Sequence, residues 1–462
     1  MPLLLLPYAT TTQALSATTA QVIHGSAPYL TFDNGVTKVT TTDGLLGITI
    51  SDGTTQTTYT PSHNTSTAAN PIVLRVANQS FADIGMLVPP TTDSIALNAL
   101  IGAPYNYWGD DDGDGQGTNG ITASGNLTVS ITDKDNQAVS RNEVLSICGA
   151  PYKVALTSTA GSLTTQYGLP NSSNFTGSTA TYYISPKAPP KICYARPSLQ
   201  YGKNNETIRG SSGWNLAGPA TIWNPIKGFL VQSTESSGYS RNFPTTGANK
   251  LYFDLDIGGV KGSALTWPTV ISQGGITATI TPSPADANNI RVTLTGPHMN
   301  NRGTPSLPQT FVLVGKDSSN NEVLKYGFEL KYWFVTRGGN YAKAPVQTTW
   351  CNSLGGGYRM SQVKDLTNAV CTSQAIAAGR NCEGAVGATP SSSTHYYQRN
   401  IGAGLFTEWG NMFYYNADFG YYPYAFWVSD SHGSERFVVG QESGDFAYNN
   451  PNYNGLAICV YP

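Results

Sequence analysis

Short runs of alternating apolar and polar residues are the feature that most limits how this chain can fold. The runs GLLGITIS (44–51), NPIVLRVA (70–77) and ITASGNLTVSIT (121–132) are typical of strands, which place successive side chains on opposite faces of a sheet. Clusters of Gly, Asn, Asp and Pro separate the runs, as turns do in a β-sandwich. Good helix formers are scarce, because only 12% of the 462 residues are charged and 49 are glycine. The sequence therefore predicts a mostly β protein.

Strand patterns continue after the proline-rich stretch SPKAPPKICYARP (185–197), which we interpret as a domain boundary. The apolar residues of LYFDLDI alternate and share one predicted face: Leu251, Phe253, Leu255 and Ile257. The segments GITATI (275–280) and NIRVTLTG (289–296) predict a hairpin. Residues 310–335 predict two strands joined by a turn at Asp317–Asn321.

The last part of the chain has a different pattern. PVQTTWCNSLGGG (345–357) predicts a helix that begins near Pro345 and ends near Gly355. One face of this helix is expected to carry Val346, Trp350 and Leu354. A second helix is expected after Ser361 as N-cap, with a stripe formed by Val363, Leu366 and Val370. Residues 396–462 are rich in aromatic residues and glycine, show no helical period and end in the predicted strand LAICVYP.

These patterns predict four segments along the chain. A disordered or linker segment at 1–19 precedes β-sandwich regions at 20–197 and 198–338, and an α+β domain follows at 339–462. A chain of this length is expected to form roughly two to four domains.

The stretch GDDDGDGQG (109–117) concentrates aspartates in a chain with little charge. Three of them are spaced like the first ligands of a calcium-binding loop: Asp110, Asp112 and Asp114. Ile121 stands where such a loop needs its last carboxylate, so this is no EF-hand. A dinucleotide-binding turn is also excluded, because a strand pattern rather than a helix follows the glycines. Two interpretations stay open: a Ca²⁺ site in the loop 110–116, completed by other groups, or a solvated acidic turn.

Charge and motifs limit the function classes. The formal net charge of −2 comes without clusters of Lys or Arg, so we expect no nucleic-acid partner. The sequence has no run of about 20 apolar residues, so we expect no membrane-spanning helix. The sequence contains neither H-E-x-x-H nor G-x-S-x-G, and we predict no catalytic residues. The six cysteines form no C-x-x-C, which favours disulfides and an oxidising compartment over a zinc site.

The segment TEWGNMFYYNADFGYYPYAFWVSD (407–430) interleaves aromatic residues with Gly, Asn and Asp. Tyr and Trp offer rigid amphipathic contact area, and Gly and Asn add adaptable hydrogen bonding, as in binding loops. About half of these aromatic residues are expected to fill a core instead. The predicted receptor-binding residues are Trp409, Tyr414, Tyr415, Tyr421, Tyr422, Tyr424 and Asp430.

Whole phrases of the sequence resemble intimin/invasin-type bacterial adhesins. The C-terminal phrases are WCNSLGGGYRMSQVKDLTNA (350–369), AFWVSDSHGSERFVV (425–439) and GLAICVYP (455–462). Earlier phrases resemble enterobacterial adhesion-domain proteins related to invasins: YNYWGDDDGDGQGTNG (105–120), SICGAPYKVALTSTAG (146–161) and FPTTGANKLYFDLDIGG (243–259). The resemblance implies immunoglobulin-like β-sandwiches followed by a C-terminal C-type-lectin-like domain, and a disulfide between Cys351 and Cys459. It leaves Cys371 to pair with Cys382, and Cys148 with Cys193.

The resemblance also implies a function. We expect a monomeric adhesin, on the bacterial surface or secreted, whose lectin-like domain binds a protein or glycan on a host or neighbouring cell. The E-P-N, Q-P-D and W-N-D motifs of calcium-dependent sugar-binding lectins are absent, and WVSD (427–430) is only distantly similar. Protein recognition is therefore at least as well supported as sugar binding. Alternatives are a carbohydrate-active enzyme with a lectin-like module, or a structural or secretion partner without a receptor. The outer-membrane barrel of intimin-type proteins is absent, so we expect a passenger piece or a separately secreted relative.

Overall fold

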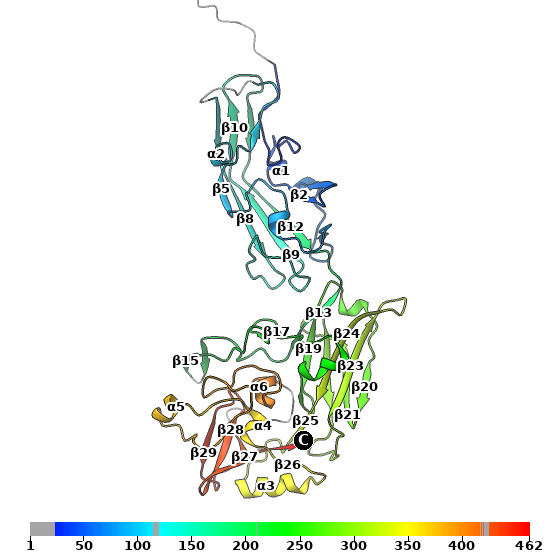
Figure 1. Cartoon of the computed structure of the whole chain (residues 1–462), viewed down its shortest axis with the longest axis vertical. Helices are drawn as coiled ribbons and strands as arrows, with labels where there is room; N and C mark the ends of the chain where they lie inside the picture. Colours follow the sequence, from blue (N-terminus) through cyan, green and yellow to red (C-terminus); the bar gives the residue numbers. More distant parts are fainter. Residues whose placement is uncertain (1–23, 114–119, 209, 416, 418, 420–424) are drawn as a thin grey trace, which may run out of the picture. The chain divides into compact units, whose positions relative to one another are not determined.

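The protein forms two compact units, which divide between Ala188 and Pro189. The computed structural model describes residues 24–113, 120–208, 210–415, 417, 419 and 425–462. Both units are built mainly of strands (Figure 1), so the predicted mostly β class is confirmed. Each unit buries its own hydrophobic core. Among the described residues, no helix is long and apolar enough to cross a membrane.

The main sheet of the first unit has five strands in the order β4-β12-β9-β8-β5. Leu127, Val129 and Ile131 of β8 point into the core, as the alternation in ITASGNLTVSIT predicts. The bounds of the five strands are Ile72–Val73 (β4), Ser178–Ser185 (β12), Tyr152–Ser158 (β9), Asn126–Thr132 (β8) and Ser94–Ala96 (β5).

Smaller sheets and short helices complete the first unit. The sheet β11-β10-β7 comprises Ser172–Phe175, Gly161–Thr165 and Ile121–Ser124, and two strand pairs comprise Tyr29–Leu30 (β1) with Trp108–Gly109 (β6) and Ile48–Ser51 (β2) with Gln56–Tyr59 (β3). The helices are α1 (Thr42–Leu45), α2 (Leu97–Leu100), η1 (Pro61–His63) and η2 (Phe81–Asp83).

The second unit begins with a sheet in the order β16-β17-β13-β19-β22-β21-β20. Its strands are Trp223–Asn224 (β16), Gly228–Leu230 (β17), Lys191–Arg196 (β13), Tyr252–Gly258 (β19), Ile290–Thr295 (β22), Ile276–Pro282 (β21) and Val270–Gln273 (β20). All four apolar residues of LYFDLDI are buried, and β21 and β22 form the predicted hairpin. The division between Ala188 and Pro189 lies inside the proline-rich stretch 185–197 interpreted as a boundary, and β13, within that stretch, belongs to the second unit.

Two more strands, β23 (Gln309–Lys316) and β24 (Glu322–Leu330), pair on either side of the turn predicted at Asp317–Asn321. The hairpin β14-β15 comprises Glu206–Ile208 and Ser211–Trp214. Three 3-10 helices also belong to this unit: η3 (Ser236–Arg241), η4 (Gly262–Ala264) and η5 (Met412–Tyr414).

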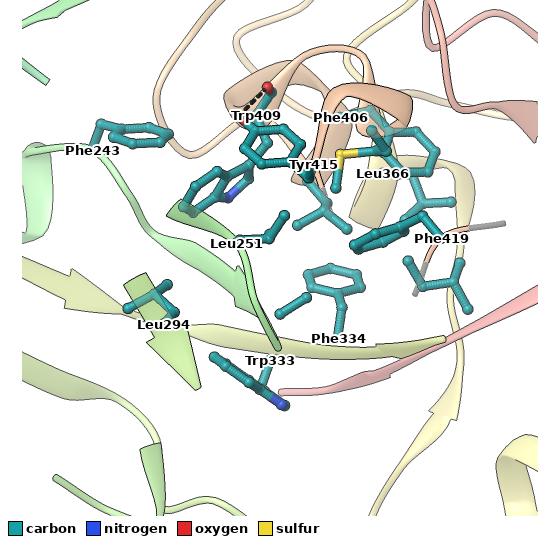
Figure 2. Packing of buried hydrophobic residues seen from close by; sticks show 14 of the residues in the cluster. Phe243, Leu251, Leu294, Trp333, Phe334, Leu366, Phe406, Trp409, Tyr415 and Phe419 are labelled. Atoms are coloured by element: carbon teal, nitrogen blue, oxygen red, sulfur yellow. Dashed lines mark hydrogen bonds between the residues drawn. The ribbon is translucent and has the colours of Figure 1, made fainter. Parts of the chain in front are cut away.

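A further sheet, in the order β18-β25-β30-β27-β28-β29 with β26 paired to β30, joins the segments expected to form separate domains. Strands β18 and β25 precede residue 339, and the others follow it. The bounds are Thr246–Ala248 (β18), Tyr332–Thr336 (β25), Leu456–Tyr461 (β30), Ala425–His432 (β27), Glu435–Gly440 (β28), Phe446–Asn449 (β29) and Arg359–Met360 (β26). One core spans both segments, and the Phe243 ring packs against the Trp409 ring with centroids 4.9 Å apart (Figure 2). Residues 198–338 and 339–462 therefore fold as one unit.

The predicted helices exist, but their details differ. The first is α3 (Ala344–Ser353), whose buried residues are Ala344, Gln347 and Cys351. Of the predicted face, Trp350 and Leu354 are half-buried and pack against the core, whereas Val346 is exposed. The second, α4 (Val363–Leu366), is capped by Gln362 rather than Ser361 and ends before Val370. Two short helices, α5 (Ser373–Ala377) and α6 (Leu405–Trp409), were not predicted. Their lengths of five residues are too short to show a helical period in sequence.

Candidate binding site

The aromatic segment begins with α6, which is buried on every side. All five of its residues are buried, as in a helix surrounded by core. Close packing at both ends requires glycine: a side chain at Gly404 would lie 2.6 Å from the carbonyl carbon of Leu366, and one at Gly410 would overlap the Arg399 guanidinium. Both glycines also have positive φ angles, +97° and +79°.

Two of the predicted receptor-binding residues lie in this core. Trp409 is fully buried and its indole N–H donates to the carbonyl of Thr246 at 3.1 Å. Tyr415 is also buried, and its hydroxyl donates to the carbonyl of Trp409 at 2.8 Å (Figure 2). The Tyr415 hydroxyl in turn accepts from the backbone N–H of Ser198 at 2.7 Å, and burial raises its pKa. Trp409 and Tyr415 therefore support the surface and do not form it, which corrects the prediction for both.

Between these anchors the chain turns outward in η5. Phe413 is 45% exposed and Tyr414 is 51% exposed, although Met412 beside them is fully buried. The two exposed rings lie edge to face with centroids 5.7 Å apart. Asn411 fixes the start of the turn, because its side-chain oxygen accepts from the backbone N–H of Phe413 at 3.0 Å. The result is an exposed aromatic pair on a turn held from both sides.

The structure separates the remaining predicted contact residues. Tyr414 is exposed, as predicted. Tyr421, Tyr422 and Tyr424 lie outside the described residues. Asp430 accepts from the backbone N–H of Val363 at 2.8 Å, so its carboxylate caps the first turn of α4 and its observed role is structural.

Phe413 was not predicted, because Tyr and Trp are the aromatic residues most typical of binding loops. Its position in the run Phe413-Tyr414-Tyr415 was the available signal. Three consecutive large aromatics in a turn cannot all face one core.

Buried polar groups hold α6 against the start of strand β18. Glu408 accepts from the backbone N–H groups of Thr246, at 2.9 Å, and Gly402, at 2.8 Å. The hydroxyl and backbone N–H of Thr245 also donate to Glu408, at 2.8 and 3.1 Å. Burial raises the pKa of the Glu408 carboxyl, and these hydrogen bonds oppose the rise.

Arg399 provides a second buried connection. Its guanidinium donates to the backbone carbonyls of Glu408, at 2.9 Å, and Tyr201, at 3.2 Å. It also lies 4.5 Å from the Trp223 ring, in cation–π geometry. Burial lowers the pKa of Arg399. Tyr201 and Trp223 belong to residues 198–338, and Glu408 belongs to α6. Arg399 therefore connects these two parts of the second unit and fixes the aromatic segment in place.

Disulfides add covalent constraints. Cys351 of α3 is bonded to Cys459 of β30, and Cys371 is bonded to Cys382, as the resemblance implies. Cys148 and Cys193 are also disulfide-bonded, and no cysteine is free.

Two aspartates of the acidic loop have partners in earlier parts of the first unit. Lys38 forms an ion pair with Asp111 at 2.7 Å, and its hydrogen bond lowers the pKa of Asp111. Asp112 accepts from the backbone N–H of Ser26 at 2.5 Å, and Asp114 lies outside the described residues. Within the described ranges, no three His, Cys, Asp or Glu side chains are arranged to hold a metal ion. Calcium binding by Asp110, Asp112 and Asp114 stays a prediction.

The fold and the site define a mostly β, disulfide-bonded protein that presents aromatic side chains on a fixed turn. No model of a known protein family matches the sequence, and no curated protein matches it. The solved structures that are similar include bacterial adhesins. Invasin, a bacterial integrin-binding protein, aligns with a TM-score of 0.35 and 13% identity over 75% of this chain and 52% of invasin. This chain thus spans about half the length of that structure.

Intimin structures align at comparable levels. The C-terminal 282-residue intimin fragment, in complex with the intimin-binding domain of the translocated intimin receptor, aligns with a TM-score of 0.31 and 11% identity over 74% of this chain and 93% of that one. An intimin mutant of EHEC O157:H7 aligns with a TM-score of 0.26 and 14% identity over 52% and 93% of the two chains. The receptors named here are those of invasin and intimin.

Proposed function

We propose that this chain is the receptor-binding part of a bacterial adhesin, and that Phe413 and Tyr414 contact the receptor. The receptor would be a protein or glycan on a host or neighbouring cell. The observation that supports this most directly is the exposure of both rings on η5 while Met412 and Tyr415 beside them are buried. A soluble domain gains nothing in stability from exposing two adjacent large aromatic rings, and such rings are typical anchors of binding surfaces.

The buried flanks matter for affinity. Association costs free energy for every side chain and loop that must be ordered. Tyr415 and Trp409 already hold η5 by a hydrogen bond of 2.8 Å between them, so this part of the turn is ordered before it binds. Aromatic side chains have only two rotatable bonds and lose little entropy on contact. The surface is therefore suited to binding rather than to chemistry.

Tyr421, Tyr422 and Tyr424 follow η5 closely in sequence, and we include them among the proposed receptor-binding residues. Location outside the cytoplasm fits the same function. All cysteines are disulfide-bonded, and disulfides persist in oxidising compartments. We propose that the protein is exported to the bacterial surface or secreted.

The test compares cell binding by the full chain with that of the variant Phe413→Ala/Tyr414→Ala. We expect loss of binding with an unchanged melting temperature, because both side chains are exposed. Tyr167→Ala is the matched control, since Tyr167 is 59% exposed in the first unit. A second variant, with Tyr421, Tyr422 and Tyr424 changed to Ala, tests the role of these three residues. Wild-type binding by the Phe413/Tyr414 variant would contradict the proposed site.

A further inference from the structure

Cationic side chains lie beside helix α3 in a chain whose net charge is −2. Helix α3 lies on the outside of the second unit (Figure 1). Three segments meet around it, residues 296–304, 336–358 and 450–456, and none contains Asp or Glu. Together they supply three cationic side chains: Arg302, Arg337 and Lys343.

These cations follow the whole length of the helix. Lys343 is exposed at the N-cap. Arg337 lies beside the middle, where its guanidinium is 5.6 Å from the Trp350 ring. Arg302 donates to the carbonyl of Ser353 at the C-terminal end, at 3.5 Å. A ten-residue helix is about 15 Å long, so the cations cover a distance longer than one small anion.

A buried amide holds the surface in shape. Gln347 is fully buried on the inner face of α3. Its oxygen accepts from Arg337 at 3.0 Å, and its nitrogen donates to the carbonyls of Asn340 and Gly455, both at 2.8 Å. Ala342 and Gly455 also exchange two backbone hydrogen bonds, at 3.1 and 3.0 Å. The helix and both neighbouring loops are therefore fixed relative to one another.

Aromatic and amide side chains accompany the cations. Tyr341 is 37% exposed and Tyr453 is 61% exposed. Exposed asparagines lie in the same loops: Asn340, Asn450, Asn452 and Asn454. A planar amide has both donors and an acceptor, which match the hydroxyl groups of a sugar. A tyrosine ring offers a flat apolar face with a polar edge.

We propose that the surface formed by α3 and the loops 337–343 and 450–455 binds an anionic glycan, a carbohydrate chain with carboxylate or sulfate groups. The cations fit any polyanion. The tyrosine rings and asparagine amides add groups that fit sugar rings and hydroxyls, and they favour a carbohydrate over an acidic polypeptide. This surface does not include Phe413 or Tyr414, and its test is independent of theirs.

The test measures binding of the full chain to immobilised heparin, which is sulfated, and to hyaluronan, which is carboxylated. Dextran serves as the neutral glycan and poly-glutamate as the acidic polypeptide. In Arg302→Ala/Lys343→Ala, we expect binding to the anionic glycan to weaken by about tenfold, from the loss of two exposed ion pairs. Lys203→Ala/Lys261→Ala removes two exposed charges elsewhere in the second unit and should bind like the wild type. Added salt should weaken wild-type binding.

Tyr453→Ala separates stacking from charge, because it should weaken binding to the glycan and leave any binding to poly-glutamate unchanged. Three results would overturn the proposal. They are no binding to either anionic glycan, equal binding by the double variant and its control, and binding to poly-glutamate as strong as to the glycans.

Discussion

Glu408 of α6 and Thr246 of β18 are 162 residues apart in sequence and share two hydrogen bonds in the core of the second unit. The backbone N–H of Thr246 donates to the carboxylate at 2.9 Å, and its hydroxyl donates at 2.5 Å. The pair connects strand β18 to the helix that supports the aromatic turn. The position of the candidate site thus depends on contacts outside the C-terminal segment.

Glu408→Gln should destabilise the second unit. Every hydrogen bond to the Glu408 carboxylate is donated to it, so the new amide NH₂ would face donors and leave one of them unsatisfied. An unsatisfied buried polar group costs about 1–3 kcal/mol. Urea unfolding measures the change, with the exposed Glu383→Gln as the control. An unfolding free energy equal to that of the control would contradict this role of Glu408.

Trp409→Ala should lower the stability of the second unit, whereas Tyr414→Ala should leave stability unchanged and weaken cell binding. Trp409 is fully buried, and removing a buried Trp costs about 3–5 kcal/mol of unfolding free energy. Tyr414 is 51% exposed, so its removal should change stability by less than about 0.5 kcal/mol. Thermal unfolding and cell binding should be measured on both variants. If Tyr414→Ala were as destabilising as Trp409→Ala, the exposed turn would be disproved.

His395 should make stability depend on pH. It is 5% exposed, packs on the rings of Tyr396 and Phe446, and its Nδ1 has no hydrogen-bond partner among the described residues. Burial lowers its pKa, nearby Arg380 lowers it further, and Asp445 opposes the shift. The unfolded chain therefore takes up the proton first, near pH 6.5.

Stability should be constant above about pH 6.5 and fall below it, by at most about 1.4 kcal/mol per pH unit. His395→Phe should remove this dependence, whereas His63→Gln, at an exposed position, should retain it. Melting temperatures from pH 5 to 8 provide the measurement. A pH dependence that is the same in wild type and His395→Phe would refute the assignment.

The acidic loop can be tested by calcium titration. If the cation binds, the melting temperature should rise, with a stabilisation of about 1.4 kcal/mol at tenfold excess over Kd. Asp112→Ala and Asp114→Ala should each abolish the shift, and EDTA should reverse it in the wild type. The ion pair between Lys38 and Asp111 already neutralises one carboxylate of the loop. An unchanged melting temperature on adding Ca²⁺ would favour the solvated acidic turn.

Helix α3 illustrates what sequence can and cannot predict. Its existence and both ends were predicted from Pro345 and Gly355, because capping is local. Its buried face was not, since Val346 is 48% exposed while the polar Gln347 is fully buried. Gln347 is buried because Asn340 and Gly455 supply its hydrogen-bond partners. Those partners meet it only in the folded chain.

The sequence by itself determined the strands and the class of the fold. The alternation in LYFDLDI places Leu251, Phe253 and Leu255 on one face whatever packs against them. Tertiary structure alone decided which residues of the aromatic segment meet solvent. Tyr414 and Tyr415 are adjacent and identical, yet Tyr415 is buried between Trp409 and Ser198 and Tyr414 is exposed. Burial depends on which distant segments arrive at each side chain, and no local pattern contains that information.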